Sequence, residues 1–189
     1  MAYKPMDIGQ PWEGCHPKKR KAPARVFRIT LLRDQIAYDI EAQLSVITRS
    51  RRTGNAEQDN TLSDIEPYRP LFNRWIDKYV SSAKGRMEAF LLERFSKSNV
   101  NGIGTDNIIE IKLAMPESWD ETVLTQLTQS IHEYVSSGVT YEYLNLTLTS
   151  NDSVTVSKRE QAELAYNDIK KYVCAYKPGT IRKAMHPFP

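Results

Sequence analysis

Apolar residues recur every three or four positions in four separate stretches of the chain, which is the pattern of amphipathic helices. The first stretch covers residues 30–52 and carries polar or charged residues between its apolar positions. Thr30 stands at its start, where a hydroxyl can accept a hydrogen bond from the first turn of a helix. The apolar positions of this predicted helix are Leu32, Ile36, Ile40, Leu44 and Ile47.

The second stretch, residues 70–96, has the most aromatic face in the chain. Pro70 stands at its start, where a missing N–H is tolerated because the first turn of a helix has no acceptor for it. An apolar stripe of this kind normally packs into a core. We therefore expect this stripe to belong to the core of a helical bundle. The stripe consists of Phe72, Trp75, Ile76, Tyr79, Val80, Ala83, Met87, Phe90, Leu91 and Phe95.

Two more helices are expected in the C-terminal part of the chain. Ser118 and Glu121, and again Ser157 and Glu160, have the spacing of capping boxes and predict the two helix starts. The Pro-Gly pair at 178–179 predicts the end of the last helix.

Small residues interrupt the first of these two helices at Ser136, Ser137 and Gly138. A glycine inside a helix costs about 1 kcal/mol relative to alanine. Its presence predicts that another backbone approaches the helix closely at this point.

One short segment has the period of a strand, because Ile109, Ile111 and Leu113 alternate with charged residues. The sequence therefore predicts a mainly α protein. We expect a small helical bundle of about four helices, with one short β segment and extended N- and C-terminal arms.

Proline spacing separates the first arm from the bundle, since four of the ten prolines fall within residues 1–26. The predicted organisation is an extended basic arm over 1–26, a helical domain over 27–178 and a C-terminal docking tail over 179–189.

Charge divides the chain in the same way. Residues 1–33 contain eight lysines and arginines and two acidic residues, which leaves 18 basic and 21 acidic residues for positions 34–189. The net charge is thus +6 in the first part and −3 in the second. This division excludes a domain-wide basic face of the kind that grips a nucleic-acid duplex.

The cysteines and the hydropathy pattern bear on the compartment. Cys15 and Cys174 are too few for a disulfide scaffold, so we expect free thiols in a reducing cytoplasm. No apolar run approaches the roughly 18 residues of a membrane span, and the first residues lack the apolar region of a secretory signal. We expect no membrane partner.

No catalytic motif is visible. His132 and Glu133 begin a zinc-protease pattern, but position 136 is a serine. Gly102 and Gly104 lack the further residues of a phosphate-binding loop. We therefore predict a protein that is not an enzyme, with no catalytic residue, no metal ligand and no cofactor.

A basic cluster remains, formed by Lys18, Lys19, Arg20 and Lys21 and followed by Arg25. Three interpretations stay open: a nucleic-acid-contacting arm, a nuclear-import signal, or a solvated or partner-docking arm. Four or five phosphate contacts would give modest and strongly salt-dependent binding. No aromatic residue alternates with the basic ones, so stacking on bases is not indicated.

Residues 109–189 resemble the head–tail connector (adaptor) proteins of tailed bacteriophages, particularly those of phages of gut Bacteroidales. An extended segment leads into "MPESWDETVLTQLTQSIHEYVSSGVTYEYLNLT", and a short break leads into "KREQAELAYNDIKKYVCAYKPGTIRKAMHPFP". The shared features are a Trp-Asp helix start after the extended segment, a long helix, a shorter helix that ends near "YKPG", and a tail.

The resemblance implies a virion protein of the particle neck, assembled in the host cytoplasm. Such proteins form homo-oligomeric rings, dodecameric in this family, which bind the portal protein and tail or neck proteins and continue the DNA channel. Their C-terminal extension can pack against the portal. The matching stretch here is 180–189, with Arg182, Lys183, His186 and Phe188 available for docking. A nucleic-acid-binding module and another phage neck or tail-completion protein remain the alternatives.

Overall fold

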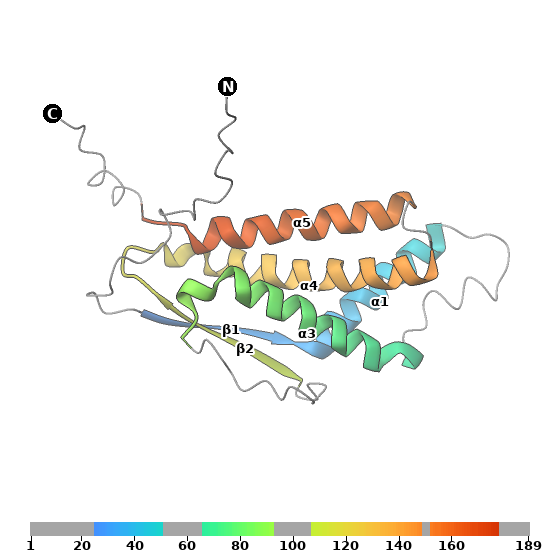
Figure 1. Ribbon diagram of the computed structural model, residues 1–189, viewed down its shortest axis with the longest axis horizontal. Helices are drawn as coiled ribbons and strands as arrows, with labels where there is room; N and C mark the ends of the chain where they lie inside the picture. Colours follow the sequence, from blue (N-terminus) through green and yellow to red (C-terminus); the bar gives the residue numbers. More distant parts are fainter. Residues whose placement is uncertain (1–24, 51–65, 93–106, 149–151, 178–189) are drawn as a thin grey trace, which may run out of the picture.

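The computed structural model describes residues 25–50, 66–92, 107–148 and 152–177. Within these ranges, four α-helices accompany a two-stranded antiparallel sheet, which confirms the expected mainly α fold (Figure 1). The elements are β1 (Arg25–Leu32), α1 (Arg33–Ser50), η1 (Glu66–Tyr68), α3 (Arg69–Arg86), η2 (Glu88–Phe90), β2 (Ile108–Met115), η3 (Glu121–Val123), α4 (Leu124–Thr147) and α5 (Ser153–Val173), where η marks a 3-10 helix.

The strand β1 corrects the prediction of a helix over residues 30–52, because residues 30–32 belong to β1 and α1 begins at Arg33. Phe27, Ile29 and Leu31 alternate with residues that point outward, and Ile29 and Leu31 are buried. β1 pairs with β2 over its whole length, from Arg25 opposite Met115 to Leu32 opposite Ile108. The predicted single β segment is therefore one of two strands, and residues 25 and 26, which were assigned to the arm, belong to β1.

The first helix is capped by a residue distant in sequence. Thr30, the predicted cap, lies within β1, and α1 begins three residues later. Asn107 takes over the capping role: its backbone carbonyl accepts from the Arg33 N–H at 2.8 Å, and its side chain accepts from the Asp34 N–H at 3.0 Å. The predicted apolar positions that fall within α1 are buried, whereas Leu32 belongs to β1 and is exposed.

The helix α3 is shorter than the apolar stripe, Phe72 to Phe95, from which it was predicted. α3 has Pro70 in its first turn, as predicted, but it ends at Arg86. Met87, Phe90 and Leu91 are nevertheless buried, because the chain turns back and Leu91 forms a β-bridge with Leu113 on the far edge of β2. Phe95 lies outside the described residues.

Both predicted capping boxes are wrong. Asp120 accepts from the Thr122 N–H at 3.1 Å and caps the 3-10 helix η3. The helix α4 follows at Leu124, not directly after Ser118, and has no side-chain cap of its own. Asp152 accepts from the Val154 N–H at 2.9 Å and caps α5, which places Ser157 inside this helix. Carboxylates thus cap η3 and α5, at positions that the serine spacing did not indicate.

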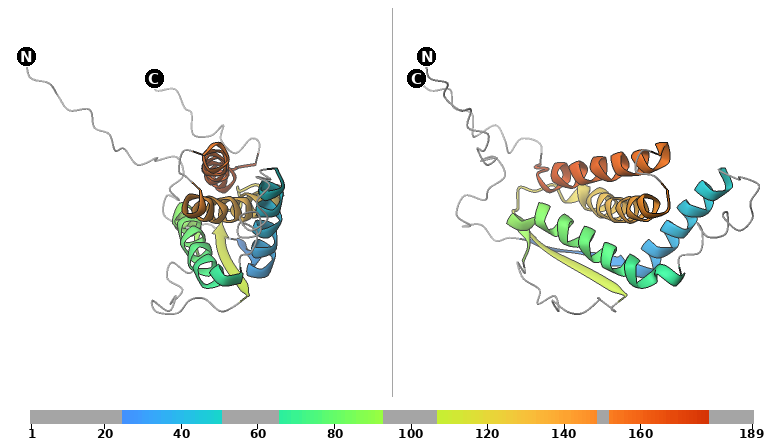
Figure 2. Two further views of the ribbon diagram at one scale, coloured as in Figure 1. Left: turned by 90° about the vertical axis from the view of Figure 1, so that its right-hand side faces the viewer. Right: turned by 45° about the vertical axis from the view of Figure 1, so that its right-hand side comes forward.

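The helix α4 forms the centre of the fold. It packs against α5 along its length and against α3 and α1 on its sides, and Figure 2 shows it enclosed between α5 and the sheet. Every residue from Tyr134 to Thr140 is buried, as expected for a helix surrounded on all sides. Gly138 does accommodate a close neighbour, but this neighbour is the ring of Tyr79 on α3 and not a backbone.

Candidate interaction surface

One end of the domain, which we call the tryptophan pole, is organised by Trp119. This side chain is 2% exposed, and its indole N–H donates to the carbonyl of Tyr172 in the last turn of α5 at 3.0 Å. The ring of Phe27 from β1 meets it edge-on, with centroids 4.9 Å apart. Trp119 therefore joins the first strand to the end of the last helix.

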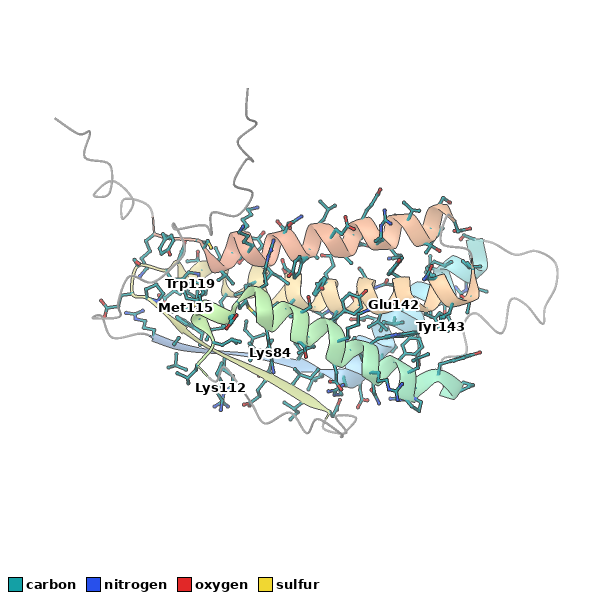
Figure 3. The ribbon with its side chains drawn as sticks, viewed as in Figure 1. Lys84, Lys112, Met115, Trp119, Glu142 and Tyr143 are labelled. Carbon is teal, nitrogen blue, oxygen red and sulfur yellow. The ribbon has the colours of Figure 1, made fainter. Side chains whose placement is uncertain are left out.

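Backbone hydrogen bonds extend this junction beyond α5. The Asp120 N–H donates to the Ala175 carbonyl at 3.1 Å, and the Lys177 N–H donates to the Ser118 carbonyl at 2.9 Å. These bonds hold residues 175–177 in an extended conformation beside the segment that precedes η3. Figure 3 shows Trp119 and Met115 together at this end of the molecule.

The tryptophan pole is also the point from which both terminal segments leave the described domain. Arg25 opens β1 there and forms an ion pair with Glu121 of η3, with a nitrogen–oxygen distance of 3.0 Å. Lys177, the last described residue, bonds through its N–H to the Ser118 carbonyl in the segment that precedes η3. Residues 1–24 and 178–189 thus start from one end of the fold.

Of the residues predicted to contact nucleic acid or a partner, the structure describes Arg25 alone. Its guanidinium is bound to Glu121, so its charge is partly neutralised within the domain. The other predicted site residues lie outside the described ranges and stay predictions. They are Lys18, Lys19, Arg20 and Lys21 in the N-terminal segment and Arg182, Lys183, His186 and Phe188 in the C-terminal segment.

The sheet presents a second candidate surface. Its inner face packs on the helices, whereas its outer face carries three exposed apolar side chains: Val26 (59% exposed), Leu32 (45%) and Ile108 (57%). Between them, Arg28 pairs with Glu110 at 3.4 Å. Figure 3 shows Lys112 on this face, directed away from the helices.

Within the part of the chain that the structure describes, the outer edge of β1, which faces away from β2, is open. The last residue pair of the sheet is Leu32 opposite Ile108, and the next pair, Arg33 opposite Asn107, is joined by the bond from the Arg33 N–H to the Asn107 carbonyl. In an antiparallel pair of strands, hydrogen-bonded and non-hydrogen-bonded residue pairs alternate. The odd-numbered residues of β1 therefore bond to β2, and the even-numbered ones direct their N–H and C=O groups away from it. Among the described residues no further strand pairs with this edge.

Sequence reasoning missed this surface because residues 25 and 26 were assigned to the arm and residues 30–32 to the first helix. The signal that would have found it is the alternation of Phe27, Ile29 and Leu31, which was overridden by the helical spacing that runs from Leu32 into α1.

A group of tyrosines joins α3, α4 and α5. The ring centroid of Tyr134 lies 5.1 Å from that of Tyr79 and 5.0 Å from that of Tyr166, and Arg86 stacks over Tyr166 at 4.4 Å. Burial raises the pKa of Tyr79, with a further contribution from Glu142, and burial also raises the pKa of Tyr134. These hydroxyls keep their protons at neutral pH, so they act as hydrogen-bond donors that hold helices together.

A polar seam lies where α5 meets α1 and α4. The Lys158 ammonium donates to Gln43 Oε1 at 2.9 Å and to Gln161 Oε1 at 3.0 Å. Gln161 in turn donates to Glu133 at 3.1 Å. Burial lowers the pKa of Lys158, and Glu133 opposes this shift. Each of these polar groups has a partner within the seam, which gives it a role in helix packing.

Outside the tyrosine group and the polar seam, the described residues include one histidine beside a carboxylate and one cysteine of interest. His132 Nε2 lies 3.3 Å from Asp39 Oδ2, and the described ranges contain no group of three or more potential metal-ligating side chains. Cys174 is disulfide-bonded, so the expectation of free thiols is wrong. None of the described helices has both the length and the apolarity needed to cross a membrane.

Comparisons with known proteins give no further assignment. No protein-family model, no curated protein and no solved structure matches this chain.

Proposed function

We propose that this protein is a structural subunit of a tailed-phage particle, a ring-forming head–tail connector that joins the portal to the tail and lines the DNA channel. The observation that carries the proposal is the common origin of the two terminal segments at the tryptophan pole. Segments that leave from one end of a rigid domain can engage one partner together, and their effective concentrations at that partner then reinforce each other.

The layout of the described domain supports the same proposal. The resemblance implies an extended segment, a Trp-Asp turn, a long helix and a shorter helix. β2, Trp119 with Asp120, α4 and α5 follow one another in this order. α4 and α5 pack along their lengths, and such a hairpin gives a stiff spacer between two attachment points.

In this proposal, residues 178–189 dock on the portal. Phe188 would be buried in an apolar pocket of the partner, while Arg182 and Lys183 would meet acidic groups at its rim. The cost of ordering the segment would oppose this gain. The described domain would remain as it is and would supply the ring contacts.

The test is electron microscopy and native mass spectrometry of the purified protein mixed with the portal protein encoded beside it. We expect rings bound to the portal. A variant truncated after residue 177 should keep its helical circular dichroism and lose portal binding. A matched variant, Phe188→Ala, should weaken binding without abolishing the ring. Monomers that never bind the portal would refute the proposal.

Contact with packaged DNA is a separable part of the proposal. Lys18, Lys19, Arg20 and Lys21 would supply it together with Arg25, whose exposed ion pair with Glu121 is weak enough to be exchanged for a phosphate contact. Changing the four cluster residues to alanine should reduce DNA affinity and flatten its dependence on salt concentration. If the variant and the wild type bind DNA alike across a salt titration, the N-terminal segment has no DNA role.

A further inference from the structure

We propose that two copies of this chain pair through the open outer edges of their β1 strands and form a continuous four-stranded antiparallel sheet. The occupant of each edge is thus the β1 strand of a second copy. The proposal rests on the backbone groups of this edge, on their register and on the side chains of the outer face, and it is independent of the ring proposed above.

The backbone supplies the first argument. Val26, Arg28, Thr30 and Leu32 direct their N–H and C=O groups away from β2, as the bond between Arg33 and Asn107 requires. An eight-residue strand with such an edge is a template for pairing with another strand. β1 carries no proline, and proline is one of the devices that block edges in natural sheets.

Only one register uses all four outward residues of both copies. In this register, Val26 lies opposite the partner's Leu32, and Arg28 lies opposite the partner's Thr30. A shift by two residues in one direction places Arg28 against the partner's Arg28, where like charges repel. A shift in the other direction leaves Val26 opposite helix α1 of the partner, where no strand is available.

The side chains of the outer face complement each other in the same register. Within one copy, Val26 lies beside Ala114 at one end of the sheet, and Leu32 lies beside Ile108 at the other end. An antiparallel partner places the Val26 end of one copy beside the Leu32 end of the other. On each side of the two-fold axis, a row of four apolar side chains then crosses the joined sheet: Ala114, Val26, the partner's Leu32 and the partner's Ile108. The apolar side chains that are exposed in one copy thereby gain neighbours.

Charges lie between these apolar rows. The partner's Thr30 lies opposite Arg28 across the contact between the two β1 strands, and the partner's Glu110 lies beside that Thr30 on the next strand. Arg28 and the partner's Glu110 are therefore two strand spacings, or about 10 Å, apart. Arginine and glutamate side chains can bridge this distance. Arg28 would therefore lie between its own Glu110, at 3.4 Å, and the partner's Glu110.

The other edge of the sheet does not offer an equivalent site. The Leu92 N–H donates to the Lys112 carbonyl at 3.0 Å, and Leu91 bridges Leu113. Part of the β2 edge is thus occupied, which favours β1 against β1 over a head-to-tail chain of sheets. Because a two-fold contact closes on itself, it gives a dimer and does not by itself build a ring.

The first test is the concentration dependence of the molar mass, followed by sedimentation or light scattering. Thr30→Pro removes an outward donor without touching the bonds to β2, and it should weaken the dimer about tenfold or more. Because a proline could also disturb the strand, the double variant Val26→Lys/Leu32→Lys provides a second test: it sets lysines against each other across the seam. Leu164→Lys, which changes a 67%-exposed leucine on α5, is the matched control and should leave the dimer intact.

The second test identifies the contact. Amide hydrogen exchange of Val26, Arg28, Thr30 and Leu32 should slow as the protein concentration rises, whereas the odd-numbered amides of β1 should be protected at every concentration. A protein that stays monomeric would overturn the proposal. So would a dimer that both edge variants leave unchanged, or one in which the even-numbered amides exchange freely.

Discussion

Replacing Gly138 by alanine tests the central packing of the fold. A Cβ at this position would lie only 2.5 Å from Cδ1 and Cζ of Tyr79, where ordinary van der Waals contacts begin near 3.4 Å. The ring cannot easily withdraw, because its hydroxyl bonds to Glu142 at 3.3 Å and its edge packs against Tyr134. Either α3 or α4 must therefore shift by most of an ångström.

The magnitude follows from two opposing effects. Overpacking of a tight site costs about 1–3 kcal/mol, and the clash with Tyr79 belongs at the upper end of this range. Alanine regains about 1 kcal/mol of helix propensity. We therefore expect Gly138→Ala to lower the free energy of unfolding by about 2 kcal/mol, measured by equilibrium urea denaturation followed by circular dichroism.

Two comparisons separate packing from propensity. Gly85, near the end of α3, has open space where a Cβ would lie, so Gly85→Ala should be neutral or stabilise by up to about 1 kcal/mol. In a Tyr79→Ala background the obstacle is gone, and Gly138→Ala should change sign and become neutral or stabilising. If Gly138→Ala behaves like Gly85→Ala in the wild-type background, the close approach of α3 and α4 is refuted.

Three further predictions concern the caps, the pole and the tyrosines. Asp152→Ala should cost about 1 kcal/mol in urea denaturation because α5 loses its cap, whereas Ser157→Ala should cost almost nothing; equal losses would contradict the observed helix start. Trp119→Phe keeps an aromatic ring but removes the indole N–H, so it should cost about 1–3 kcal/mol and lower the thermal midpoint, and an unchanged midpoint would argue against Trp119 as the anchor of the pole. The pKa values of Tyr79 and Tyr134 are raised by burial. Their contribution is therefore complete below the usual pKa of about 10 and is lost as the pH rises through the folded-state values. Denaturation at about pH 9 and pH 11 should show a smaller alkaline loss in the Tyr79→Phe/Tyr134→Phe variant than in the wild type, and identical losses would count against the raised pKa values.

The sequence by itself determined the elements whose evidence is local. The faces of α1 and α3 follow from side chains three and four positions apart, which share one side of a helix whatever surrounds it. Pro70 marked the start of α3 because proline has a fixed φ and no N–H. Gly138 marked a close approach because glycine has no side chain, although the neighbour is the ring of Tyr79 and not the predicted backbone. The predicted fold class therefore agreed with the structure.

Tertiary structure alone decided the elements that depend on distant partners. β1 exists because residues 25–32 find β2 some 80 positions later, and this pairing outweighs the helical spacing that begins at Leu32. Asn107 caps α1 for the same reason, and Trp119 draws the end of α5 to the start of β1. A local pattern records which side of an element is apolar, but it does not record what will cover that side. The open edge of β1 and the common origin of the terminal segments became visible only when these distant parts were brought together.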